Sequence, residues 1–65
     1  MKGVVRAGRG EVFLFRGPAS LRLIAGAAEA IGAVWRPGAS VSIPEGKSIP
    51  VEFSGRGALR WDAAA

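Results

Sequence analysis

The chain has 65 residues, carries a formal net charge of +4, and contains no cysteine and no histidine. A chain this short forms at most one domain, over residues 1–65, and its core contributes little free energy beyond the cost of ordering the chain. Disulfides and zinc sites built on cysteine or histidine are excluded, so good packing, self-association or a larger partner must compensate. The hydrophobic fraction of 49% favours association.

Two further features bear on the protein's surroundings. The amino terminus lacks the apolar core of a signal peptide, and the longest apolar tract, residues 23–35, contains Glu29 and is too short to cross a bilayer. We therefore expect a cytoplasmic protein without membrane contact. Arginine outnumbers lysine by seven to two and asparagine, glutamine and threonine are absent, a bias that favours a thermophilic origin and that a GC-rich genome would also produce.

The first part of the chain alternates between strand-like segments and turn residues. Val4 and Val5 open a short strand, which a turn at residues 8–10 ends. Residues 11–16 are almost all apolar, which predicts a strand that is covered on both faces or lies in an interface. Residues 19–24 follow the Gly-Pro turn at 17–18 and alternate between apolar and polar side chains, which predicts a half-buried strand, with Ile24 as an exception on the polar side.

Residues 25–33 are ambiguous, because they combine helix-forming alanines with two glycines that each cost about 1 kcal/mol inside a helix. The surrounding segments are spaced about 8 to 12 residues apart with turn signals between them, which favours a strand over a short helix. The alanines of this strand would let another backbone approach closely.

The most regular pattern lies in residues 36–53. Apolar and polar residues alternate over 41–43, and the alternation resumes over 48–53 after a turn at 44–47. The pattern predicts a β-hairpin that is polar on one side and begins at the Pro-Gly turn of residues 37–38. Pro50 donates no ladder hydrogen bond, so the second strand is expected at a sheet edge or with a bulge there.

The last predicted strand spans residues 58–62, with Leu59 and Trp61 facing inward, and residues 62–65 are expected to form a frayed tail. Six or seven short strands without a long helix predict an all-β fold, either a small β-sandwich or a jelly-roll-like barrel.

One short motif invites a phosphate-loop interpretation. Gly46, Lys47 and Ser48 match the end of a Walker loop, which also requires a glycine five residues before the Gly-Lys pair and a helix after it. The first of these positions holds Val41, and a strand with a proline follows. We therefore expect a turn and no nucleotide site.

A second spacing, formed by Gly38, Pro44 and Gly46, is similar to the second conserved box of the cupins. The positions of the metal ligands in that box hold Ile49 and Phe53 here. The carboxylates show no ligand spacing either; they are Glu11, Glu29, Glu45, Glu52 and Asp62. The sequence thus predicts no metal and no cofactor.

Catalysis is not expected from this chain. Its five serines have no histidine base, cysteine is absent, and a Ser-Lys arrangement through Lys47 would be coincidental. The protein is therefore predicted not to be an enzyme.

The remaining candidate for a functional site is a basic binding face. Basic residues occupy turns and outward strand positions, a placement that suits contact with nucleic-acid phosphate. One of these basic residues is Arg6. The others are the candidates for nucleic-acid binding: Arg9, Arg16, Arg22, Arg36, Lys47, Arg56 and Arg60. Trp35 or Trp61 could add a stacking surface if exposed. Alternatively, both tryptophans belong to the core and the arginines form a solvated surface.

Several turn motifs follow one another in a recognisable order: Gly-Pro-Ala-Ser-Leu-Arg-Leu at 17–23, Gly32, Arg-Pro-Gly at 36–38, Pro44, Gly-Lys at 46–47 and Ile-Pro-Val-Glu at 49–52. Together they resemble the small N-terminal β-domain of the polynucleotide 5'-hydroxyl kinases of RNA processing, over residues 11–53. The resemblance implies a β-sandwich that works beside other components of an RNA-processing or ribonucleoprotein complex. No counterpart of the kinase domain is present, so phosphoryl transfer is not implied.

What the resemblance carries over is limited to structural turn positions, which are Gly17, Pro18, Pro37, Gly38, Pro44, Gly46 and Pro50. The leading hypothesis is a non-enzymatic β-sandwich module that contacts RNA phosphate through its arginines and a protein partner through its apolar surface. One alternative is a protein-only structural module that forms a homo-oligomer and whose basic residues are merely solvated. Another is a regulatory domain that docks on a separate kinase subunit.

Overall fold

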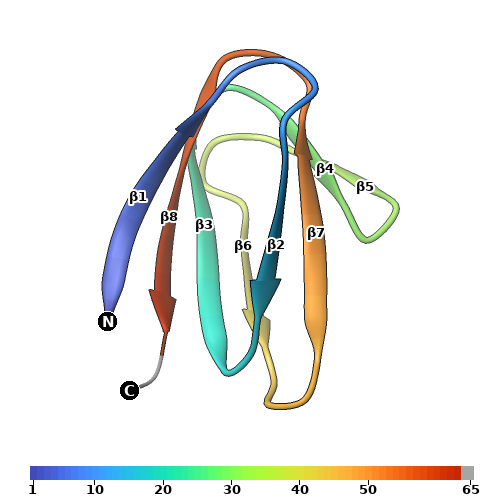
Figure 1. The fold of residues 1–65 in the computed structure, drawn as a ribbon. Coiled ribbons are helices and arrows are strands. Elements are labelled where there is room, and N and C mark those ends of the chain that lie inside the picture. Colours follow the sequence, from blue (N-terminus) through green and yellow to red (C-terminus); the bar gives the residue numbers. More distant parts are fainter. Residues whose placement is uncertain (64–65) are drawn as a thin grey trace.

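The structure, a computed structural model, describes residues 1–63 of the chain. These residues form strands and no helix (Figure 1). The strands are β1 (Lys2–Ala7), β2 (Val12–Arg16), β3 (Ala19–Ala25), β4 (Ala28–Ala30), β5 (Ala33–Trp35), β6 (Ser40–Ile43), β7 (Ser48–Phe53) and β8 (Gly57–Ala63). The predicted all-β fold is confirmed, with eight strands in the described residues rather than six or seven. None of these residues belongs to a helix that could span a membrane.

The strands form two antiparallel sheets of four strands each, which we call the β1 sheet and the β2 sheet. The β1 sheet has the order β1-β8-β3-β6, and the β2 sheet has the order β2-β7-β4-β5. Every connection except the one from β4 to β5 passes from one sheet to the other. This arrangement is a jelly-roll sandwich, in which β1 and β8 bring the first and last described residues side by side (Figure 1).

The core lies between the sheets because each strand places alternate side chains inward. Its largest fully buried side chains come from four strands, β3, β6, β7 and β8: Phe53, Leu21, Leu23, Ile43, Leu59 and Val51. Phe13 adds an edge-to-face contact with Phe53, at 5.9 Å between ring centroids. Leu59 is buried and Trp61 packs against the core, so the predicted inward orientation of both is confirmed.

The prediction that residues 36–53 form a β-hairpin is wrong. The two strands are joined by a turn in which the amide of Lys47 donates to the carbonyl of Pro44 at 3.2 Å, but β6 pairs with β3 and β7 pairs with β2 and β4. Alternation fixes which face of a strand is apolar and leaves its pairing partner open. Placing the strands in opposite sheets lets Ile43 and Val51 both enter the core.

The prediction that the strand of Pro50 is an edge strand or has a bulge is wrong, because β7 lies between β2 and β4 and pairs with β2 in an unbroken register. Although β7 lies between two strands, β4 is short and pairs with it only at Glu52 and Phe53. Beside Pro50, β7 therefore has only Leu14 of β2 as a neighbour. The missing N–H of the proline costs no ladder bond on the open side.

Residues 25–33 form strand rather than helix, but they are divided among three strands: residue 25 ends β3, residues 28–30 form β4 and residue 33 begins β5. The chain turns at Gly26, runs through β4, and turns again at Ile31 and Gly32, whose φ angles are 53° and 72°. Two consecutive residues with positive φ make the tight two-residue turn typical of hairpins. A second backbone comes close at Gly26, a turn residue and not one of the alanines expected to allow this approach, since a Cβ there would overlap the carbonyl oxygen of Arg56.

Two smaller expectations are also decided by the pairing. The exposed Ile24 on the polar side of β3 coincides with a shift of register between Leu23 and Ala25 against β8, which leaves Ile24 as an extra residue. The tail expected at 62–65 is not frayed at its start, because Ala63 ends β8 and its amide donates to the carbonyl of Met1 at 2.7 Å. Residues 64–65 lie outside the described part of the chain.

The apolar segment at 11–16 becomes β2, which is an edge strand of its sheet. Phe13 and Phe15 point inward and are half-buried, whereas Val12 and Leu14 point outward and are 58% and 63% exposed. Among residues 1–63 nothing covers the outer side of this strand, so the expected cover on both faces is wrong, and the alternative of an interface stays a prediction.

Candidate nucleic-acid interface

The outer face of the β1 sheet gathers basic side chains from strands that are far apart in the sequence. Alternation directs the even-numbered residues of β1, β8, β3 and β6 outward, where they are exposed, apart from the half-buried Ala58. Register then places Arg60 of β8 directly beside Arg22 of β3. Val4 and Ser40 complete this row across the sheet. Neighbouring positions on the same face hold Lys2, Arg6, Ser20, Ser42 and Asp62.

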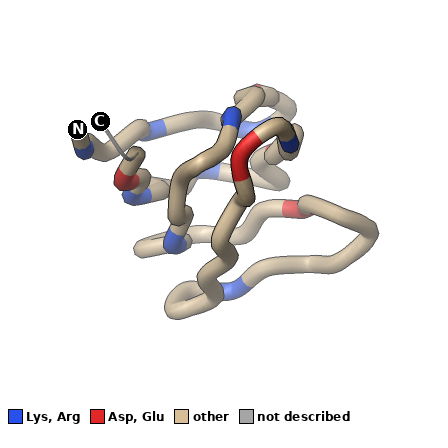
Figure 2. The backbone as a smooth tube through the Cα atoms, turned by 90° about the horizontal axis from the view of Figure 1, so that it is seen from below, with Lys and Arg blue, Asp and Glu red and all other residues tan. Residues whose placement is uncertain are grey.

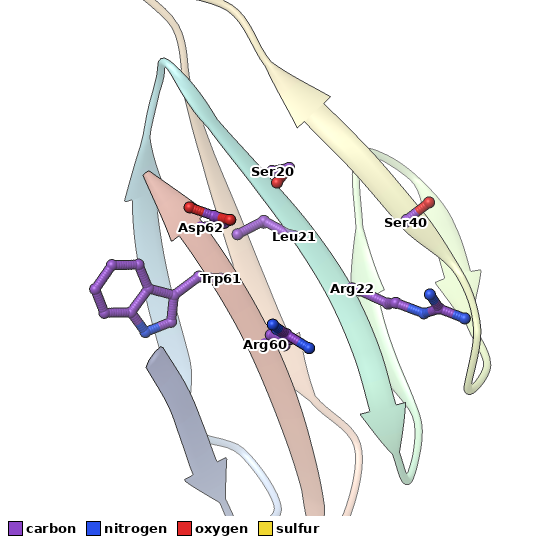
Figure 3. A pocket seen from close by; sticks show the side chains of 7 residues that line it. All are labelled: Ser20, Leu21, Arg22, Ser40, Arg60, Trp61 and Asp62. Carbon is purple, nitrogen blue, oxygen red and sulfur yellow. The ribbon is translucent and has the colours of Figure 1, made fainter. Parts of the chain in front are cut away.

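Two arginines directly across from each other repel, so their placement is unfavourable unless an anion lies between them. A shallow pocket of about 260 Å³ surrounds the pair, lined by Ser20, Leu21, Arg22, Ser40, Arg60, Trp61 and Asp62. Figure 3 shows the arginine and serine side chains of β3, β6 and β8 gathered around it. Guanidinium groups and hydroxyls are the donors that proteins use to hold phosphate oxygens.

The charges of the two outer faces differ in sign. The outer face of the β1 sheet has one acidic residue, Asp62, against the basic residues Lys2, Arg6, Arg22 and Arg60. The outer face of the β2 sheet has Glu29 and Glu52 against Arg16. Other basic residues lie in turns, so they are spread along the whole backbone in Figure 2. The β1 sheet is therefore the face that a polyanion would approach.

The seven residues predicted to bind nucleic acid do not form one site. Arg22 and Arg60 are brought together on the outer face of the β1 sheet. Arg16 and Lys47 line a different hollow at the turns beside Gly17, where Glu45 partly offsets their charge. The remaining three lie in loops and do not line the pocket around the pair: Arg9, Arg36 and Arg56. Arg56 lines a hollow with Arg6 and Glu11. The connection from β7 to β8 lies at the opposite end of the sandwich from the connection between β6 and β7 (Figure 1).

Sequence reasoning missed the serines that border the arginine pair. Ser20 and Ser40 have the outward parity of Arg22, so the alternation could have singled them out. Lys2 was missed because β1 begins two residues before the predicted strand.

The tryptophans offer little stacking surface. Trp35 is buried in the core, and Trp61 is half-buried with its indole packed over Gly3, where a Cβ would lie 2.9 Å from the ring. In Figure 3 the ring of Trp61 extends away from Arg22. Binding at this face would therefore depend on charge and hydrogen bonds rather than on base stacking.

The positions that a cupin would use for metal ligands lie in the core. Ile49 is half-buried and Phe53 is fully buried. In the described part of the chain, no three carboxylates come close enough to hold a metal ion. The Gly46-Lys47 pair lies in a turn that leads directly into β7, with φ of Gly46 at 83°.

Comparisons with family models, with curated proteins and with solved structures found no match for this chain. The geometry of the outer faces therefore carries the functional argument.

Proposed function

We propose that this protein is a non-enzymatic binding module that holds the phosphate backbone of RNA on the outer face of the β1 sheet. The observation that carries the proposal is the pairing of Arg22 with Arg60, bordered by the hydroxyls of Ser20 and Ser40. The resemblance to the β-domain of the polynucleotide 5'-hydroxyl kinases supplies the RNA-processing or ribonucleoprotein setting. A cytoplasmic location and a thermophilic origin accompany this proposal as predictions.

The physical argument starts from the repulsion within the arginine pair. A nucleic-acid backbone presents regularly spaced anionic groups, and one or two of them above the pair would replace repulsion by charge-assisted hydrogen bonds. Lys2 and Arg6 extend the same face along β1, so a strand of RNA could follow it beyond the pocket. No aromatic side chain is exposed on this face among the described residues, so we expect little preference for base sequence.

The affinity should be modest and strongly dependent on salt. Contact with about four phosphates of a single strand gives a slope of log K against log salt near −3, at about −0.7 per phosphate. Dissociation constants for such sequence-independent contacts are about 10⁻⁴ to 10⁻⁶ M at physiological salt.

The proposal is tested by fluorescence anisotropy with a labelled single-stranded RNA, between about 50 and 200 mM salt. The double variant R22Q/R60Q should bind about tenfold or more weakly and show a slope smaller by about 1.4, the share of two phosphates. The variant R16Q/K47Q removes the same charge from another part of the surface and is the matched control. Equal losses in the two variants, or no binding of the unmodified protein at low salt, would contradict the proposal.

A second candidate function, a homo-oligomeric structural module, is favoured by one specific observation on the opposite face. Glu29 of β4 lies directly beside Glu52 of β7, among exposed apolar side chains. Docking on a separate kinase subunit has no comparable support among residues 1–63.

A further inference from the structure

The outer face of the β2 sheet carries a pair of like charges in its two central strands. Register places Glu29 of β4 beside Glu52 of β7, and Val34 and Val12 complete the row on the two edge strands. A shallow pocket of about 240 Å³ lies over this row and is bordered by Pro50 and Ile31 as well as by both glutamates. Two carboxylates thus stand next to each other inside an otherwise apolar surface.

Several features of this face are unfavourable in an isolated domain. Adjacent carboxylates repel across the strands. Val34 and Ile31 are both 66% exposed, and Ile31 adopts a φ of 53°, which is costly for a β-branched residue. Unfavourable features of different kinds, concentrated on one face, indicate that the face is covered by a partner that is both cationic and apolar.

The protein itself carries a surface of that description. On the β1 sheet, the row Val4, Arg60, Arg22 and Ser40 has its two charges in the central strands β8 and β3. On the β2 sheet, the row Val12, Glu52, Glu29 and Val34 has its two charges in the central strands β7 and β4. Both pairs join adjacent strands, about 4.8 Å apart, so the arginines match the glutamates in spacing.

We propose that the outer face of the β2 sheet binds the outer face of the β1 sheet of a second copy of this chain. Arg22 and Arg60 of one copy then face Glu29 and Glu52 of the next, and the flanking valines supply apolar contact. The contact joins two different faces, so it is heterologous, and each added copy offers a free face of each kind. A two-fold contact between identical faces is disfavoured because it would set glutamates against glutamates or arginines against arginines.

The size of the molecule limits the strength of this contact. The two largest dimensions of its Cα trace are 29 and 22 Å, so a face covers about 600 Å² per copy. The total buried area is then about 1,200 to 1,300 Å², at the lower end of specific interfaces. We therefore expect reversible association in the micromolar range or weaker, and weakening by salt because the contact is electrostatic.

This inference goes beyond the proposed function and does not rest on it. The two share the arginine pair, so RNA and a second copy compete for the same face. The glutamate pair belongs to self-association alone, which makes the two proposals separable by mutation.

The test uses two variants that each lose one of the two faces. E29Q/E52Q keeps the arginine face, and R22Q/R60Q keeps the glutamate face. In sedimentation velocity at low salt, between about 10 µM and 1 mM protein, the unmodified chain should form dimers and larger species. Each variant alone should associate at least tenfold more weakly than the unmodified chain and should therefore stay largely monomeric. An equimolar mixture should form dimers of one copy of each variant and nothing larger, because only one pair of complementary faces remains.

Three results would overturn the proposal: a strict monomer at about 1 mM, undiminished association of E29Q/E52Q, or a mixture that stays monomeric. Misfolding does not obscure the test, because replacing Glu29 and Glu52 by glutamine removes a repulsion, and circular dichroism checks the fold of each variant. RNA binding by E29Q/E52Q should be unchanged or stronger if the proposed function holds, because a second copy no longer competes for its arginine face. If the unmodified protein self-associates as expected but does not bind RNA, only the proposed function is rejected.

Discussion

Gly17 lies where the chain crosses from β2 to β3, and its backbone touches the turn that follows β6. A Cβ on this residue would overlap the carbonyl oxygen of Pro44 and lie 2.6 Å from that of Ile43. The amide of Gly17 also donates to the carbonyl of Lys47 at 2.9 Å. Both neighbours of the added atom are backbone, so neither can move aside without disturbing the connection between the sheets.

We therefore expect Gly17→Ala to lower the free energy of unfolding by about 3 kcal/mol, at the upper end of overpacking costs. Gly55→Ala is the matched control, because a Cβ at Gly55 meets no atom within 4 Å. The control should change the free energy of unfolding by less than about 0.5 kcal/mol. Urea denaturation of both variants measures the difference, and equal stabilities would show that the two crossover segments are not in contact.

At the same scale, sequence patterns predicted the inward side chains well and the close contacts poorly. The orientation of Leu59 and Trp61 follows from alternation within one strand, which needs no knowledge of the partner strands. The need for glycine at position 17 arises from a carbonyl of Pro44, which is distant in the sequence and near only once both sheets have formed. Gly-Pro at 17–18 marked a turn without revealing what the turn packs against.

At the scale of elements, one residue in the turn of the β4–β5 hairpin lowers the stability of the fold. Its two turn residues, Ile31 and Gly32, both have positive φ, the conformation for which Asn-Gly is preferred. An isoleucine in this conformation costs about 1 to 2 kcal/mol, whereas asparagine adopts it readily. The side chain of Ile31 is exposed, so its removal takes little away from the core.

Ile31→Asn should consequently stabilise the monomer by about 1 kcal/mol and raise the melting temperature by about 4 to 8 °C. Ile24→Asn replaces another exposed isoleucine, which does not have a positive φ, and should give no such gain. Thermal unfolding at low protein concentration compares the two. A melting temperature for Ile31→Asn at or below that of the unmodified protein would contradict the assigned turn. Ile31→Asn should also weaken the self-association of the protein, since Ile31 borders the pocket over Glu29 and Glu52.

The sequence left undetermined which strands pair with each other. Residues 41–43 and 48–53 looked like partners because one short turn joins them, yet they enter opposite sheets. In a jelly roll, a tight turn can connect sheets as well as neighbours within one sheet, and local alternation is identical in both cases. A strand was predicted over residues 25–33, but its division into β4 and β5 was not, because strands of three residues carry too weak a pattern.

At the scale of the whole molecule, the two sheets present outer faces of opposite character. Sequence analysis identified Arg22 and Arg60 as outward residues, but their adjacency follows from the pairing of β3 with β8 and could not be read locally. The pairing of Glu29 with Glu52 was hidden for the same reason. Both proposed interactions, with RNA and with a second copy, depend on which outward residues the topology makes neighbours.

The most direct test of the proposed RNA-binding face is an NMR titration of isotope-labelled E29Q/E52Q, the variant predicted not to self-associate, with single-stranded RNA at about 50 mM salt. The account predicts that the largest amide shifts occur in β3 and β8, around residues 20–22 and 60–62, with little change in β2 and β7. Shifts concentrated on the β2 sheet or around the turn at 44–47, or no shifts at all, would contradict it.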